Sequence, residues 1–276
     1  MRTKLWFVAL LAPVAVSACS FDSDGGYRRR SDAEIVFAIS QAKNADGKLT
    51  TSVGYELLDL GSKGWTARGV VTKDRSCWAE KLDDRLGQPK VEGGFATFEG
   101  GLLPQNGIAV VANRSEELTL DAPAWDVGGT ALTFQARGFA MPDIPPTRLV
   151  VPSTTLAISQ PAETGEIKVQ PTPELEIAWT DADAKHSENV VAALQTTPAD
   201  GSRGVELRCF FERRAGKGSF PKVIVDRFLS LAGDGEVKGT LSISTHRQLT
   251  IHADGGWKVY VVATVAQREQ PFVMDR

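Results

Sequence analysis

The sequence predicts an all-β protein with two β-sandwich domains behind a lipoprotein signal peptide, the second domain being immunoglobulin-like. Short segments in which apolar and polar residues alternate recur through both halves of the chain, and Gly, Pro, Asn or Asp bound most of them. Alternation with period two places the apolar side chains on one face of a strand. Many short strands separated by turn residues are typical of a sandwich or barrel.

The chain begins with the layout of a bacterial lipoprotein signal. Two basic residues, an apolar run over 5–16 and a pair of small residues precede Cys19. The apolar run is too short to span a bilayer stably, and small residues before a cysteine suit a lipoprotein signal peptidase. We expect residues 1–18 to be removed, Cys19 to carry lipid, and residues 19–32 to form a lipidated tether. The alternative is an ordinary secretory signal that happens to end beside a cysteine.

The charge balance of the chain bears on its partners. The whole chain has 31 Lys and Arg residues against 34 Asp and Glu residues, and removal of the signal would take away two basic ones. An acidic chain is poorly suited to phosphate backbones, so we expect no nucleic-acid partner. The one basic block, residues 28–30, lies in the tether. It is either solvated or attracted to anionic headgroups.

The first domain is predicted over residues 33–146. The Pro-rich stretch over 141–146 supplies a hinge to the second domain. Six segments of the first domain show strand-like alternation, at 34–39, 53–60, 65–72, 95–98, 108–112 and 132–136.

The second domain is predicted over residues 147–276. Its strands include 175–179, 205–211 and 241–251, and turn residues at 254–256 predict a hairpin into the strand that starts at Trp257. Residues 221–231 suit a short helix that Pro221 opens, although Val223 and Val225 would equally suit a strand. We expect Trp179 in the core of an immunoglobulin-like sandwich, which would lack the early cysteine of a true immunoglobulin domain.

Two cysteines remain in the mature chain, Cys77 and Cys209. An exported protein can form disulfides, and an even count permits this pair. However, Cys209 lies on the apolar face of an alternating strand, where a small buried thiol is common, and Cys77 is expected at a strand end. The sequence therefore leaves the disulfide open; if formed, it would join the two halves.

Parts of both halves resemble predicted exported lipoproteins of myxobacteria and related bacteria. The likeness covers about two thirds of the mature chain, and its motifs are turn prolines, core aromatics and strand patterns. These motifs lie at 124–128, 132–138, 142–152, 161, 175–180, 205–211, 221–231 and the hairpin at 257. Those proteins generally carry more than one cysteine in the first half, where this chain has only Cys77. The resemblance implies a β-rich exported lipoprotein of unknown function and transfers no catalytic residue.

Hydrolase, kinase and nucleotide-binding signatures are missing from the sequence. There is no Gly-x-Ser-x-Gly elbow, and the Gly-Lys-Gly at 216–218 lacks the earlier glycine and the hydroxyl residue of a phosphate loop. The adjacent acidic pairs at 83–84 and 116–117 would point to opposite faces if extended. Cys209 has no assignable His and Asn or Asp partners as a catalytic cysteine.

Metal and histidine chemistry are also poorly supported. His246 and His252 share a strand face, but about 20 Å would separate them, so we expect both at the surface. Asp181, Asp183 and Glu188, with a histidine at 186, lack the pattern of a calcium loop and are expected in a solvated loop. We expect no metal and no cofactor.

Three tryptophans offer the one positive hint of a binding face. Trp65, Trp78 and Trp125 lie beside turn residues. An exposed ring could stack on a sugar or fill a partner's pocket. The alternative is that these rings plug the open ends of the sandwiches.

These observations favour a lipid-anchored, non-enzymatic binding or structural module of the bacterial cell envelope. Ser20 follows Cys19, not the aspartate common in inner-membrane retention, so we expect the outer membrane, on its periplasmic or surface face. The partners would be the membrane, through the lipid, and an envelope protein or a glycan. The main alternative is an envelope enzyme that acts on glycan or peptide through carboxylates that sequence spacing does not reveal. A third possibility is a sugar-binding module.

Overall fold

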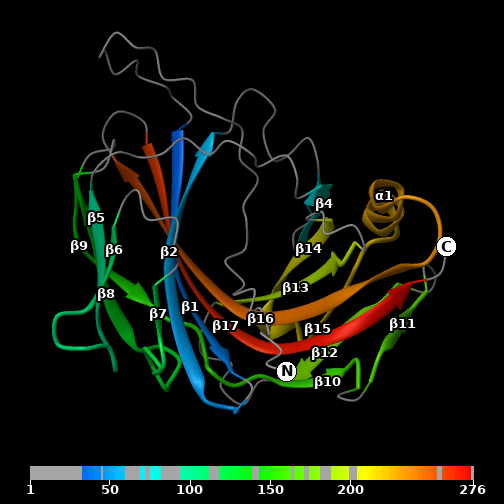
Figure 1. Ribbon diagram of the computed structural model, residues 1–276, viewed down its shortest axis with the longest axis horizontal. Helices are drawn as coiled ribbons and strands as arrows, with labels where there is room; N and C mark the ends of the chain where they lie inside the picture. Colours follow the sequence, from blue (N-terminus) through cyan, green and yellow to red (C-terminus); the bar gives the residue numbers. More distant parts are fainter. Residues whose placement is uncertain are drawn as a thin grey trace, which may run out of the picture.

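The computed structural model describes residues 33–44, 46–59, 69–71, 75–81, 94–111, 118–138, 143–162, 165–170, 174–180, 188–198, 204–253 and 257–274. These residues form three sheets, one α-helix and a short 3-10 turn (Figure 1). The predicted all-β, sandwich-like fold class is therefore confirmed. No helix among the described residues combines the length and the apolar character needed to cross a membrane.

The largest sheet has ten strands and contains both ends of the described chain. β1 is parallel to β17, and the edge strand β11 also pairs with β17 in parallel. Strands from both sides of residue 146, where we expected the domain boundary, share this sheet. Its strands, in spatial order, are β3 (Gly69–Val71), β4 (Arg75–Lys81), β14 (Val205–Glu212), β13 (Asn189–Thr196), β16 (Val237–Ala253), β17 (Trp257–Met274), β1 (Ala33–Lys43), β2 (Leu49–Asp59) and β7 (Leu118–Leu120), with β11 (Ile167–Val169) off this path.

Two smaller sheets and the helix cover different parts of the large sheet. Figure 1 shows the four-stranded sheet at one end of the long β16–β17 hairpin, and the three-stranded sheet and the helix at the other. The four-stranded sheet contains, in order, β6 (Ile108–Val111), β5 (Phe95–Gly100), β8 (Ala131–Arg137) and β9 (Ile144–Val150). The three-stranded sheet contains β10 (Ala157–Gln160), β12 (Glu176–Thr180) and β15 (Lys217–Ser219), and the helix is α1 (Lys222–Ala232).

Two apolar cores lie on one face of the large sheet. The first core packs β1, β2, β16 and β17 against the four-stranded sheet, with Phe37 in contact with Phe134 at a ring distance of 5.0 Å. The second core packs β4, β13, β14 and the other half of the hairpin against α1 and β12, and it includes Trp179 as expected. The registers place both cores on the same face, because Phe37 lies beside Val261 and the alternation continues across the sheet.

Polar side chains separate the two cores. Gln41 accepts a hydrogen bond from the amide of Ala124 at 2.8 Å and donates one to the carbonyl of Trp125 at 3.2 Å. The Thr245 hydroxyl donates to the Ser153 carbonyl at 2.8 Å, and the carboxylate of Glu188 accepts from the Ser153 amide at 3.0 Å. We call these residues the polar seam. Their hydrogen bonds hold the chain at residues 124–125 and at Ser153 against the large sheet.

The helix and the C-terminal hairpin agree with the sequence. α1 starts after Pro221 and ends at Gly233, whose φ of 97° suits glycine. It buries Val225 and Phe228 against the second core, so the alternative of a strand at this position is wrong. β16 and β17 pair antiparallel across the predicted turn, and at 17 and 18 residues both are longer than expected.

The predicted hinge at 141–146 lies partly in a strand. Pro145 and Pro146 belong to β9, which pairs with β8 at the edge of the four-stranded sheet. Proline cannot donate to a ladder, so an edge position accommodates it and discourages pairing with another chain. Residues 141 and 142 lie outside the described residues.

We expect Phe134→Ala to lower the free energy of unfolding by about 3–5 kcal/mol, because it removes a fully buried ring from the first core. The matched control is Phe95→Ala in the same sheet, since Phe95 is 44% exposed and should cost no more than about 0.5 kcal/mol. Urea denaturation of both variants measures the difference. Equal losses would mean that the core does not depend on this ring.

Candidate functional site

The face of the large sheet opposite the two cores, which we call the second face, carries buried polar and charged side chains. Alternation on β14 turns Leu207 and Cys209 into the second core and leaves Arg208 on the second face. Arg208 and Glu206 are each 1% exposed, and His246 on β16 is 7% exposed. This part of the sheet is therefore buried on both faces, although the strand pattern alone indicated a solvated side.

Arg208 and Glu206 form a buried ion pair. An Arg208 Nη2–H donates to Glu206 Oε2 at 2.8 Å. Pairing is what allows both charges to remain away from water, because an isolated buried charge is very costly. Glu80 on β4 lies directly opposite Glu206 and is also buried, so two carboxylates face each other across this strand pair. The acidic pairs at 83–84 and 116–117 lie outside the described residues.

Aromatic rings extend from the ion pair across the second face. Trp78 stacks on Phe210 with ring centres 5.4 Å apart and planes 21° apart. Phe210 in turn meets His246 edge to face, at 5.1 Å and 87°. The three rings come from β4, β14 and β16. Trp78 and Phe210 connect the paired strands β4 and β14, whereas Phe210 and His246 connect β14 to β16, which the backbone ladder joins only through β13.

His246 is neutral at ordinary pH. Burial, and then the nearby positive charge of Arg208, lower its pKa to about 3, and a hydrogen bond with Gln248 opposes this shift only partly. The Thr264 hydroxyl lies 3.4 Å from His246 Nδ1. The expectation of a surface His246 is wrong because this strand lies in the middle of a sheet whose second face is buried, whereas His252, nearer the strand end, is exposed as expected.

A cavity of about 10 Å³ lies among these side chains. That volume is close to the space needed by a single water molecule. Its lining comes from β13, β14, β16 and β17: Val191, Ala193, Arg208, Phe210, Ser242, Ser244, His246 and Thr264.

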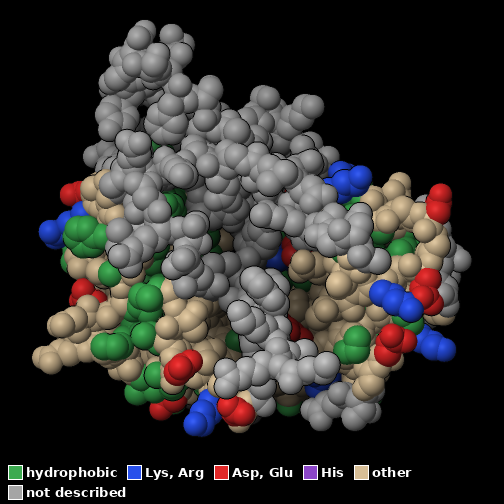
Figure 2. Space-filling view, viewed as in Figure 1, with side chains coloured by type: hydrophobic (Ala, Val, Ile, Leu, Met, Phe, Trp, Pro, Cys, Tyr) green, Lys and Arg blue, Asp and Glu red, His purple; other side chains and the backbone are tan. Residues whose placement is uncertain are grey.

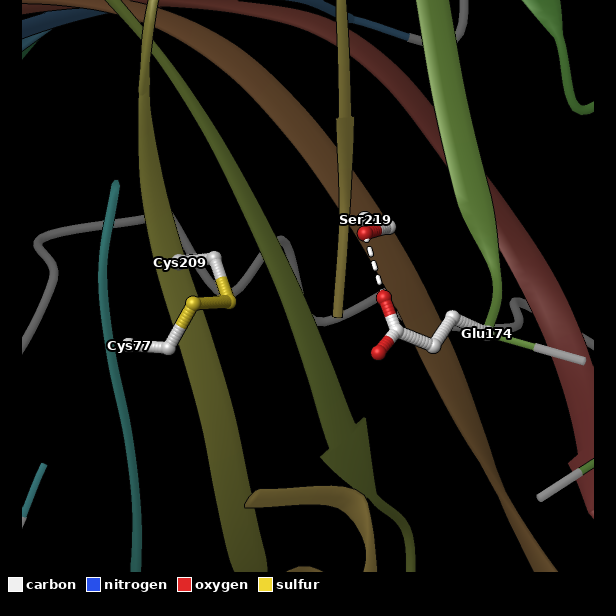
Figure 3. Close-up of a disulfide and its surroundings, with 4 residues drawn as sticks. All are labelled: Cys77, Glu174, Cys209 and Ser219. Atoms are coloured by element: carbon white, nitrogen blue, oxygen red, sulfur yellow. Dashed lines mark hydrogen bonds between the residues drawn. A yellow bond between two sulfur atoms is a disulfide. The ribbon is translucent and has the colours of Figure 1, made fainter. Parts of the chain in front are cut away.

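Cys77 and Cys209 form a disulfide. They are direct cross-strand neighbours on β4 and β14, with Cα atoms 4.1 Å apart, and both are fully buried in the second core (Figure 3). Cys77 lies inside β4 and not at its end. The bond joins positions 132 residues apart and so holds an N-terminal strand to the C-terminal half.

Figure 3 also shows a contact at the three-stranded sheet, where the Ser219 hydroxyl of β15 donates a hydrogen bond to the Glu174 carboxylate at 2.6 Å.

The predicted aromatic site is not assembled by the described residues. Trp125 is fully buried in the first core and donates its indole N–H to the Pro152 carbonyl at 3.0 Å. Trp78 is 7% exposed and lies on the second face. Neither ring is exposed for stacking on a sugar, and the two lie on opposite faces of the large sheet. Trp65 and the lipidation residue Cys19 lie outside the described residues.

Of the acidic segment considered for metal binding, Glu188 lies within the described residues. Glu188 is buried in the polar seam, where it pairs with Arg213 and accepts from the Ser153 amide, so the expectation that it lies in a solvated loop is wrong. Asp181, Asp183 and His186 lie outside the described residues. Within the described ranges, no three His, Cys, Asp or Glu side chains come close enough together to hold a metal ion.

The visible surface is mixed in character. Figure 2 shows acidic and basic side chains interspersed over the described part of this face, without a large area of one sign. Among the described residues, the large apolar side chains that stand exposed are Phe95, Leu102, Leu118, Val127 and Val223.

Comparison with known proteins finds no match, either to a protein-family model or to a curated protein.

Replacing both cysteines, as Cys77→Ala with Cys209→Ala, should lower the free energy of unfolding by about 2–5 kcal/mol, because the unfolded chain would regain the freedom that a long cross-link removes. Guanidinium denaturation measures this loss. Guanidinium denaturation of the wild-type protein in the presence of a reductant should lower the unfolding midpoint by a similar amount. An unchanged midpoint in both experiments would contradict a stabilising role.

His246 should make the protein less stable in mild acid. Its pKa is about 6.5 in an unfolded chain and about 3 in the fold, so below pH 6.5 the unfolded chain binds a proton that the folded chain excludes. We expect this group to remove about 2 kcal/mol of stability between pH 7 and pH 5. Urea midpoints at both pH values should show this loss in the wild type and in His252→Gln. His246→Gln should lack it, and an equal loss in all three proteins would contradict the assignment.

Proposed function

We propose that this chain is a lipid-anchored, non-enzymatic binding or structural module of the bacterial cell envelope, held at the outer membrane. The observation that carries the proposal is the buried disulfide between Cys77 and Cys209. Disulfides persist in oxidising compartments and are rare in the cytosol. A bond built into the second core therefore supports a protein that folds after export, in agreement with the lipoprotein-like signal before Cys19.

The start of the fold leaves room for an anchor. The first described strand begins at Ala33, so residues 19–32 would join a lipidated Cys19 to the sheet. Fully extended, this tether reaches at most about 50 Å. It would let the folded part stand clear of the headgroups while remaining on the membrane.

The chemistry of the second face supports a binding or structural role. Its strongest charges, Arg208 and Glu206, are buried and paired with each other, and the cavity that Arg208 helps to line has room for about one water molecule. An envelope enzyme acting on glycan or peptide would need an accessible acid pair. Glu80 and Glu206, which lie opposite each other on β4 and β14, are both buried. A protein or glycan partner would therefore meet the outer surface of the fold.

We expect Cys19→Ala to abolish incorporation of labelled palmitate and to release the protein from the membrane fraction, because the acceptor thiol is lost. Ser20→Ala, one residue further on, should keep both the label and the membrane association. Metabolic labelling followed by fractionation measures both outcomes. Label retained by Cys19→Ala would refute the anchor.

The non-enzymatic part of the proposal has a separate test. Purified protein should not cleave peptidoglycan fragments or envelope peptides. Crosslinking in intact cells should instead capture a partner with the wild type and not with Cys19→Ala. Hydrolysis that Glu206→Gln abolishes would favour the enzyme alternative.

A further inference from the structure

The cavity on the second face is small and partly polar. Arg208, His246, Ser242 and Ser244 contribute polar groups to its lining, and the remaining lining is mainly apolar. Small apolar cavities in proteins stay empty, whereas polar ones hold water when two to four partners converge.

Two buried atoms of the lining residues lack hydrogen-bond partners within the described structure. They are Arg208 Nε, a donor, and Nε2 of His246. Both residues are more than nine-tenths buried. Buried polar groups in native proteins are nearly always satisfied by protein or by ordered water, so each orphaned atom calls for a partner.

We propose that this cavity holds one structural water molecule, which accepts a hydrogen bond from Arg208 Nε–H and donates one to His246 Nε2. The acceptor role of Nε2 requires a neutral ring with its proton on Nδ1, which places that N–H beside the Thr264 hydroxyl at 3.4 Å. The Ser242 and Ser244 hydroxyls supply further partners for the water.

The charge and size of the site select water over other occupants. A cation would meet the guanidinium of Arg208, and an anion would find that charge already neutralised by Glu206. A volume of about 10 Å³ leaves no room for an organic molecule. The water would link β14 to β16 across β13 and hold the guanidinium in the orientation that pairs with Glu206.

A high-resolution crystal structure of the wild-type protein tests the proposal directly. We expect a water peak within about 2.7–3.2 Å of both Arg208 Nε and His246 Nε2. An empty cavity would overturn the proposal. So would an anion at this position, which an anomalous peak in a bromide-soaked crystal would identify.

A variant and a solution measurement test the same claim independently. Ser244→Val should fill the cavity and remove the water peak, whereas Thr250→Val, at an exposed position on the same strand, should keep it. Long-range ¹H–¹⁵N spectra of the wild type should show His246 as the Nδ1–H tautomer. A water peak that persists in Ser244→Val, or an Nε2–H tautomer, would contradict the assignment.

Discussion

The parallel pairing of β1 with β17 is the contact on which the rest of the structure depends. Eight residue pairs, from Glu34 with Lys258 to Gln41 with Val265, join the N-terminal hairpin β1–β2 to the C-terminal hairpin β16–β17. Without this contact the first core would lose one wall, because Phe37 packs beside Val261 in front of the four-stranded sheet. The two strands are more than 200 positions apart in sequence. Forming their contact therefore carries the loop-closure entropy cost of the long chain between them.

The long hairpin then carries both cores. β16 and β17 line the first core near their shared turn and the second core near their other ends, and the register shifts between Ile243 and Ser244. A bulge of this kind bends and twists a strand. The polar seam meets the sheet near this bulge, through Thr245, and ties the segment at Ser153 to it. Shared strands and a shared seam leave little freedom for one core to open without the other.

The sequence predicts local structure here better than long-range structure. Alternation identified strands such as 95–98 and 132–136 because each has one buried face, and Pro221 with Gly233 marked the helix. Alternation shows on which face of a strand a side chain lies, but it does not show which strands pair with each other. It therefore could not predict the β1–β17 pairing. The same limit explains Arg208 and His246. Their faces were readable, but their burial depends on strands and segments that meet only in the folded chain.

Native-state hydrogen exchange tests most directly whether one sheet unites the two cores. The amides of β1, in the first core, and of β14, in the second, should exchange with the same free energy of opening, equal to that of global unfolding. Their response to low concentrations of denaturant should also coincide. Exchange of β14 through an opening that leaves β1 protected, or the reverse, would show that the cores unfold separately and would contradict this account.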